Sequence, residues 1–325
     1  MDRLLSISTF LFLLSVWGFI IFLVAKKRYI DSMSRIIFIL ATVVEIAYFI
    51  WRWIKSYHLG IGHIPLSNAF ESFVFFTLSI AIIACIFIKK MHSLAIFVVS
   101  LVILGILSYL SISPFNKEIE PLIPALRSNW LTVHALTSFL SYAAFFLAFI
   151  GGTMFLIKSN EKKSSFFIGN ISFSLCVGLM LSFLLLKILE IKSIIFLILF
   201  ILFSVIIFLF VYFSKNELQN IMPQEEALKN FTIGSIYIGF PFLSIGIVTG
   251  SVWAKYAWGA YWSWDPKETW SLITWFIYIF FLHLRIRGKS NYTLAIMSII
   301  GFIAVIITYI GVNFILPGLH SYGSS

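Results

Sequence analysis

Ten apolar runs, each long enough to cross a lipid bilayer as a helix, alternate with short polar segments along this sequence. They span about 9–25, 36–54, 70–88, 93–112, 131–157, 166–186, 193–213, 231–252, 269–284 and 292–315. Hydrophobic residues make up 61% of the 325 residues and charged residues only 11%, so a water-soluble core could not be covered. We therefore predict an all-α fold: a polytopic integral membrane bundle of about 10 transmembrane helices, forming one domain over 1–325.

The weakest part of this prediction is the pair 166–186 and 193–213, which only six residues separate. Without that pair the bundle would have eight helices, and the sidedness of everything after it would be unchanged. The first run, 9–25, precedes its basic cluster, which is the reverse of the charge order in a secretory signal peptide. We expect this run to be retained, with the N-terminus outside.

The net charge of +10 predicts membrane orientation rather than a nucleic-acid partner, because the basic residues form short clusters between apolar runs. With an external N-terminus, 14 of the 23 Lys and Arg residues lie on the inner side, as the positive-inside rule requires. These are Lys26, Lys27, Arg28, Arg35, Lys89, Lys90, Lys158, Lys162, Lys163, Lys215, Lys229, Arg285, Arg287 and Lys289. The segment 253–268 is then predicted to be an external loop.

That segment, 253–268, concentrates aromatic side chains between two apolar runs. Its aromatic residues are Trp253, Tyr256, Trp258, Tyr261, Trp262 and Trp264. Clustered indoles offer a broad π surface with a few fixed N–H donors, which suits a planar, mostly apolar ligand. An interfacial aromatic belt is the alternative. A belt does not require the Asp265-Pro266 that follows, which is typical of a capped helix start beside an anchored loop.

Several polar groups stand inside or beside the apolar runs. Glu45 lies in the second run, where it either faces a partner or a cavity or is a neutral, hydrogen-bonded carboxyl. Cys85 and Cys176 are interpreted as core thiols. The parity of the runs places His134 and His320 on the same external side as the aromatic segment and His283 near the inner side. We assign no function to the other three, His58, His63 and His92.

Two stretches resemble the CcsA (ResC) family of cytochrome c biogenesis proteins, which belongs to the tryptophan-rich WWD haem-handling superfamily. The longer is Trp258-Gly-x-Tyr-Trp262-x-Trp264-Asp265-Pro-Lys-Glu-Thr-Trp270, and the shorter is Gly62-His-x-Pro-x-Ser-Asn-x-x-Glu-Ser72. The Asp-Pro-Lys-Glu continuation is similar to CcsA rather than to CcmC or CcmF, the nearest rivals. Glycines in 234–250 are expected to let helices pack closely before this motif.

The resemblance implies a site for haem b, bound without covalent attachment, on the external side. By resemblance His134 and His320 are its axial ligands, while Trp258, Trp262 and Trp264 pack on the porphyrin, with Trp253 and Tyr261 beside them. Asp265 fixes the loop by capping. His283 matches the intramembrane histidine of the family, at which haem would be received on its way out. Lys267, Arg127 or Lys255 would pair with the propionates.

The function implied is cytochrome c biogenesis of the system II type: haem is moved to the external face and presented to apocytochrome c, together with a CcsB (ResB) partner. No catalytic residue is evident, so the chain would be a subunit of a holocytochrome c synthase rather than a self-sufficient enzyme. The alternatives are a haem exporter or chaperone of the CcmC type, or a general solute transporter, which would show internal repeats. We expect a bacterial plasma membrane, with the plastid thylakoid as the alternative, and membrane lipid as the surroundings.

Overall fold

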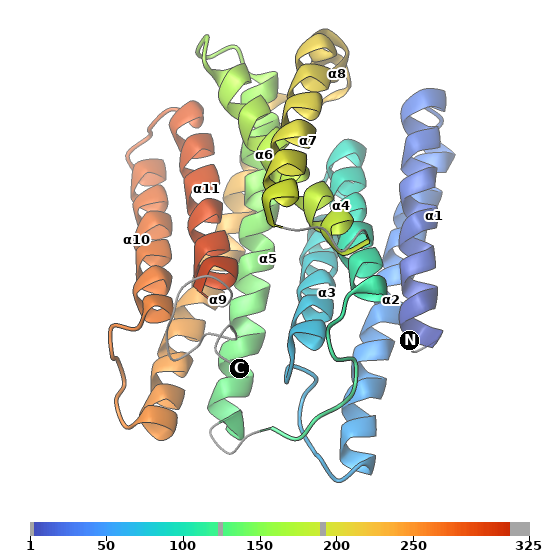
Figure 1. Cartoon of the computed structure of the whole chain (residues 1–325). Helices are drawn as coiled ribbons and strands as arrows, with labels where there is room; N and C mark the ends of the chain where they lie inside the picture. The colour runs from blue at the N-terminus through green and yellow to red at the C-terminus, as the bar shows by residue number, and fades with distance from the viewer. Residues whose placement is uncertain (1–2, 123–125, 189–192, 313–325) are drawn as a thin grey trace.

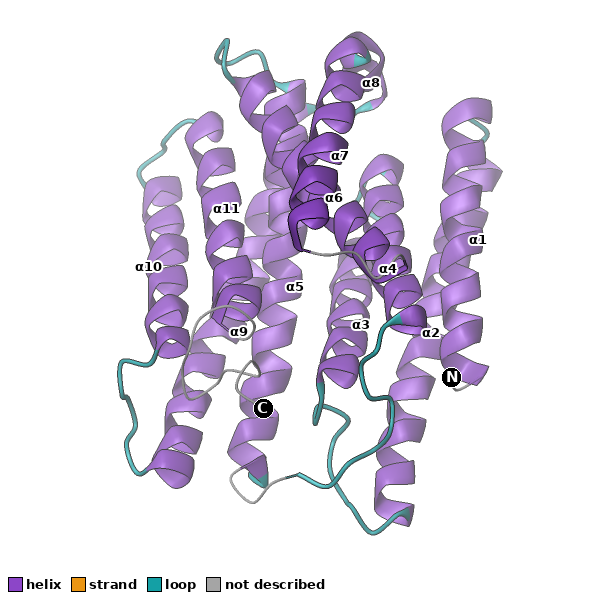
Figure 2. Cartoon of the chain, in the orientation of Figure 1, coloured by secondary structure: helices purple, strands orange, loops and turns teal. Residues whose placement is uncertain are grey.

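The computed structural model describes residues 3–122, 126–188 and 193–312. Within these ranges the chain is helical and contains no strand (Figure 2). Its helices are α1 (Arg3–Ala25), α2 (Arg28–His58), α3 (Ala69–Phe87), α4 (Ser93–Ile112), α5 (Asn129–Lys158), α6 (Ser165–Ile188), α7 (Ser193–Phe213), α8 (Lys215–Ile221), α9 (Glu225–Trp258), α10 (Pro266–Ile286) and α11 (Asn291–Ile306), and a π-helical turn, Ile307–Gly311, extends α11.

The predicted bundle of about ten membrane helices is confirmed. Nine helices of the described part are long and apolar enough to cross a membrane, and α6 is a further long helix whose stretch Ser165–Leu179 is apolar but shorter. α6 and α7 are therefore both present. α2 and α9 extend well beyond the apolar runs that predicted them, because polar and aromatic residues continue each helix by one or more turns. Residues 313–315 of the expected last run, 292–315, lie outside the described residues.

α5 is the central helix of the bundle and packs along α9 (Figure 1). Glycine makes this contact close, as the sequence predicted for 234–250. A Cβ atom on Gly239 of α9 would lie 2.7 Å from the Phe145 ring of α5, and one on Gly151 of α5 would lie 2.5 Å from Thr232 Oγ1 of α9. Neither site has room for a side chain, so the two backbones approach each other directly.

The connections alternate between the two ends of the bundle. Segments 59–68, 113–122 and 259–265 lie at one end, which we call the loop end and which is at the bottom of Figure 1. Segments 26–27, 88–92, 159–164 and 287–290 lie at the other, the basic end. The basic clusters of the sequence fall in or beside the connections of the basic end, and Arg35 of α2 donates there to Met91 O, 3.1 Å away.

His92, to which we assigned no function, has a structural role at the basic end. It is half-buried as the N-cap of α4, where its Nδ1 accepts from Leu94 N at 3.3 Å. Burial, and then the nearby Arg35, lowers the pKa of His92 below its ordinary value. The neutral ring can therefore accept the backbone N–H at neutral pH.

At the loop end a buried ion pair joins α2, α3 and segment 113–122. Arg52 Nε donates to Glu71 Oε1 at 2.7 Å, and Arg52 Nη2 donates to the carbonyl oxygens of Lys117 (2.9 Å) and Glu118 (3.1 Å). Glu71 Oε2 accepts from both the N–H and the hydroxyl of Ser67, at 2.8 and 2.7 Å. This cluster is the Arg52–Glu71 clasp, and it gives Ser67 and Glu71 of the shorter motif a structural role.

Asn68 and His63 of that motif are structural as well. Asn68 caps α3 by accepting from Glu71 N at 2.9 Å. The His63 ring nitrogens lie 2.8 Å from Ile64 O and 2.7 Å from Glu120 O, so the ring links segments 59–68 and 113–122.

We predict that Glu71→Ala destabilises the protein by about 3–5 kcal/mol, because it leaves the Arg52 guanidinium buried without its partner. The measurement is thermal unfolding of the purified protein in detergent. The matched control is Glu226→Ala, which breaks an exposed Glu226–Lys229 pair and should leave thermal unfolding nearly unchanged. Equal losses in both variants would contradict a stabilising role for the clasp.

Candidate functional site: a histidine pocket beside the tryptophan loop

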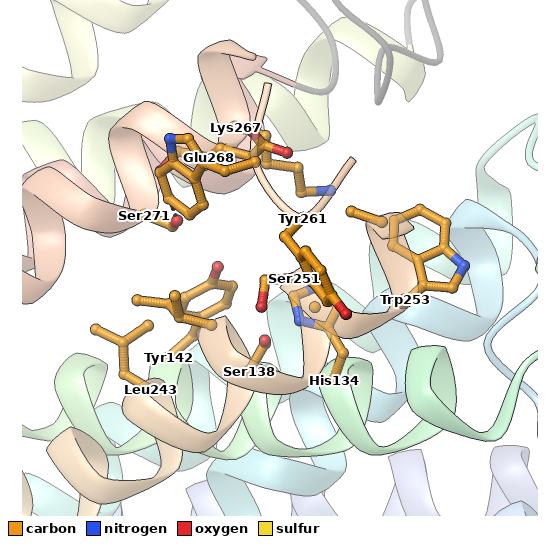
Figure 3. A pocket seen from close by; sticks show the side chains of 14 residues that line it. His134, Ser138, Tyr142, Leu243, Ser251, Trp253, Tyr261, Lys267, Glu268 and Ser271 are labelled. Atoms are coloured by element: carbon orange, nitrogen blue, oxygen red, sulfur yellow. Dashed lines mark hydrogen bonds between the residues drawn. The ribbon is translucent and has the colours of Figure 1, made fainter. Parts of the chain in front are cut away.

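A pocket opens at the loop end between α5, α9, segment 259–265 and the start of α10. The space inside it, counting its open mouth, is about 550 Å³. Side chains of α5 and α9 form one wall, and those of the loop and α10 face them (Figure 3). The lining residues used below are His134, Ser138, Gly250, Trp253, Tyr261, Trp262, Lys267 and Glu268. The pocket therefore joins α5 to a motif that follows it by more than 100 residues.

The imidazole of His134 is held in one orientation by α9. Its Nδ1 lies 2.7 Å from Gly246 O. A carbonyl only accepts, so Nδ1 carries the proton and Nε2 carries the lone pair. One turn further along α9, a Cβ atom on Gly250 would lie 2.5 Å from Nδ1 and 2.8 Å from Cε1 of the ring. Gly246 and Gly250 thus form a socket that fits an imidazole, and a backbone carbonyl that accepts from one ring nitrogen is typical of histidines whose other ring nitrogen ligates a metal.

The aromatic side chains of 253–264 lie partly in the pocket and partly outside it. Of the predicted loop 253–268 only 259–265 connects the helices, so Trp253 and Trp258 belong to the end of α9. Trp253, Tyr261 and Trp262 line the pocket, whereas Trp258 and Trp264 lie outside its lining. Trp253 is buried and makes an edge contact with Trp258, with ring centroids 5.8 Å apart. Trp264 is 70% exposed and makes an edge contact with Trp262 at 5.9 Å. The aromatic cluster is therefore continuous from the pocket to the surface.

Hydrogen bonds at both ends fix the loop. At its start, Gly259 ends α9 in a left-handed conformation (φ 83°), and Lys255 Nζ donates to Gly259 O at 2.9 Å. At its end, Asp265 caps α10 by accepting from Lys267 N at 2.9 Å, so the predicted cap is confirmed. Glu268 completes a capping box.

Glu268 also holds the backbone on both sides of Trp264. Its Oε2 accepts from Ser263 N at 2.7 Å and from Asp265 N at 3.3 Å. Trp264 between them has φ 59°, which is unfavourable for a bulky residue and indicates a locally constrained backbone. Glu268 was not among the site residues predicted from the sequence, although its position three residues after Asp265 was the available signal.

Of the three basic residues considered for carboxylate binding, only Lys267 lines the pocket. Arg127 donates from Nε to Leu122 O at 2.8 Å, and Lys255 donates from Nζ to Gly259 O at the start of the loop. His283 is exposed in the last turn of α10, at the basic end and so far from the pocket. His320 lies outside the described residues.

A family model described as "Cytochrome C assembly protein" matches residues 66–320. That range covers most of the chain, including the longer motif, the shorter motif from Leu66 onward and the whole pocket. The chain belongs to the CcsA family of cytochrome c biogenesis proteins. Its relatives include proteins named cytochrome c biogenesis protein CcsA from Guillardia theta, 33% identical over 96% of this chain and 91% of the relative, and Gloeobacter violaceus, 37% identical over 84% and 80%. The CcsA protein of Prochlorococcus marinus is 35% identical over 98% of this chain and 93% of the relative.

Membership of this family gives the chain a role in cytochrome c biogenesis and makes it a multi-pass membrane protein. It also implies involvement of haem and apocytochrome c. The pocket is the part of the described structure where a histidine, aromatic rings and a lysine converge.

We predict that Gly250→Ala lowers the yield of holocytochrome c by about 10–100-fold, the range expected when a group orienting a metal ligand is lost. The new Cβ would overlap the His134 ring, which cannot move without losing its bond to Gly246 O. Gly234→Ala, on the same helix but away from the pocket, is the control, because its Cβ would meet only the end of the Phe87 ring at 3.2 Å. Haem-stained holocytochrome c in cells carrying each variant is the measurement. Full yield with Gly250→Ala would contradict the socket.

Proposed function

We propose that this protein binds haem b in the pocket at the loop end and presents it there to apocytochrome c. Haem is cargo in this reaction, delivered from the basic end of the bundle and consumed when two apocytochrome thiols add to its vinyl groups. The observation that carries the proposal is the orientation of His134, whose Nε2 lone pair is fixed by the Gly246 carbonyl inside an aromatic pocket.

His134 fits the requirement for an axial ligand to haem iron. The four porphyrin nitrogens leave two axial positions, and a neutral imidazole is a good ligand for iron. The second ligand we propose is His320, which lies in the C-terminal segment. A protein with two imidazoles in these positions would hold haem iron firmly while the edge of the macrocycle stays accessible.

The indoles would hold the porphyrin itself. Trp253 and Trp262 line the pocket with Tyr261, and Trp258 and Trp264 extend the aromatic surface outward by their edge contacts. Flat, polarisable rings suit a flat, polarisable ligand. Asp265 acts indirectly: it caps α10 and so fixes the position of the loop that carries Tyr261, Trp262 and Trp264. Lys267 is the residue we propose for pairing with a haem propionate.

His283 would act earlier, as a ligand that receives haem near the basic end. It is exposed on the last turn of α10, where a second ligand from a CcsB (ResB) subunit could reach it. That partner would also complete the synthase, because this chain supplies positioning and control of iron rather than a general acid, base or nucleophile. A haem exporter or chaperone of the CcmC type would use the same pocket without thioether formation.

The decisive experiment is the visible spectrum of reduced haem in the protein purified with its CcsB-type partner. We predict that His134→Ala and His320→Ala each lose most of the bound haem and that added imidazole restores it, since imidazole can occupy the vacated axial position. His58→Ala, at an exposed helix end of α2, is the matched control and should keep wild-type haem. Unchanged haem in both test variants would move ligation elsewhere.

We further propose that the loop end faces the outside of a bacterial plasma membrane. The support is the gathering of basic residues at the opposite end, as the positive-inside rule requires. We predict that Ala260→Cys is labelled by a membrane-impermeant maleimide on intact cells, whereas Lys289→Cys is labelled only after the membrane is opened. Both positions are exposed. The reverse pattern would invert the orientation and exclude the pocket as the site of attachment.

A further inference from the structure

Glu45 lies in the middle of α2, away from both ends of the bundle and from the haem pocket. Its side chain is fully buried against α3. One carboxyl oxygen, Oε1, lies 2.7 Å from the hydroxyl oxygen of Thr77 on α3. The other, Oε2, is buried with no hydrogen-bond partner. A charge on such a group would be unusually costly in the interior of a membrane protein.

The hydrogen atoms around Thr77 decide which form of the carboxyl fits. Thr77 Oγ1 lies 2.7 Å from Val74 O as well as from Glu45 Oε1. A hydroxyl has one proton to donate, and a carbonyl oxygen can only accept. If Glu45 were ionised, two acceptors would compete for the single Thr77 proton. If Glu45 carries a proton, it donates to Thr77 and Thr77 donates to Val74 O, so both short contacts are satisfied.

The helices packed against α2 supply no counter-charge. In its described residues, α1 has one charged side chain, Arg3, at the loop end. On α3 the charged side chain is Glu71, which is held in the clasp, and the other titratable group is the half-buried Cys85 thiol, which donates to Thr42 at 3.7 Å. None of these groups would stabilise a carboxylate at Glu45.

The two cations of α2 nearest to Glu45 are distant and already bonded. Arg52 is seven residues away, about 10 Å along the helix, and pairs with Glu71. Arg35 is ten residues away, about 15 Å in the opposite direction, and pairs with Asp31. Moving either would break a set of hydrogen bonds at its own end of the bundle.

We propose that Glu45 is a proton-binding site within the membrane: a carboxylic acid that stays neutral at physiological pH and joins α2 to α3 by donating its proton to Thr77. The ligand of this site is a proton, and its release would leave an unpaired carboxylate between two packed helices. The site is separate from haem binding and does not depend on it.

Infrared difference spectroscopy of the whole protein tests this inference. A carboxylic acid has a C=O stretching band that a carboxylate lacks. We expect the wild type to show one such band that Glu45→Gln removes, and to keep it between pH of about 5.5 and about 8.5, where an ordinary glutamate of pKa about 4.3 is ionised. Glu225→Gln, at an exposed position, is the control and should remove only carboxylate absorption. Loss of carboxylate absorption in Glu45→Gln would overturn the proposal.

A second pair of variants tests the hydrogen bond, and keeps the inference testable if Glu45→Gln fails to fold. Thr77→Val removes the acceptor and should shift the acid band to higher frequency, because the O–H is no longer bonded. Thr77→Ser keeps the hydroxyl and should leave the band in place. An acid band that is absent from the wild type, or unaffected by Thr77→Val, would contradict the assignment.

Discussion

The close contact between α5 and α9 positions His134 and therefore the whole candidate site. Glycine at 239, 246 and 250 of α9 brings the two backbones together, and at Gly250 it leaves space that the imidazole fills. The same contact supplies the carbonyl that selects the tautomer of the ring. One helix thus provides the donor ligand while the other provides its orientation, and the tryptophan loop follows directly from the second helix. Any change that separates these helices would move the histidine relative to the indoles.

The membrane fold and its helix order could be predicted from hydropathy, because spanning length and charge bias are properties of composition along the chain. The cap at Asp265 was also predictable, since Asp-Pro before a helix acts locally. The socket around His134 was not predictable, because Gly246 lies 112 residues away and a glycine pattern does not say which side chain it receives. The division of the aromatic residues between pocket and surface likewise depends on loop geometry, above all on the left-handed Trp264 and the two amides held by Glu268.

Two buried carboxyls on α2 and α3 show how the same group serves opposite purposes in one helix pair. Glu71 meets a guanidinium, a hydroxyl and a backbone amide, so its negative charge is fully paired. Glu45 meets one hydroxyl that already serves a carbonyl, so its surroundings fit the neutral acid. The sequence placed both residues in or beside apolar runs but could not distinguish them. What separates them is their neighbours. Glu71 lies at the loop end beside Arg52 and Ser67, whereas Glu45 lies in the middle of α2 beside Thr77.

The Arg52–Glu71 clasp has a consequence for how sequences of this family can vary. Arg52 donates to the backbone oxygens of Lys117 and Glu118 in segment 113–122, and every residue type has that oxygen. The side chains at 117 and 118 are therefore free to diverge among relatives without weakening the clasp. The number of residues between α4 and this contact is not free, because an insertion would carry the two carbonyls away from the guanidinium. We therefore expect selection to constrain the length of this connection more than the identity of its side chains.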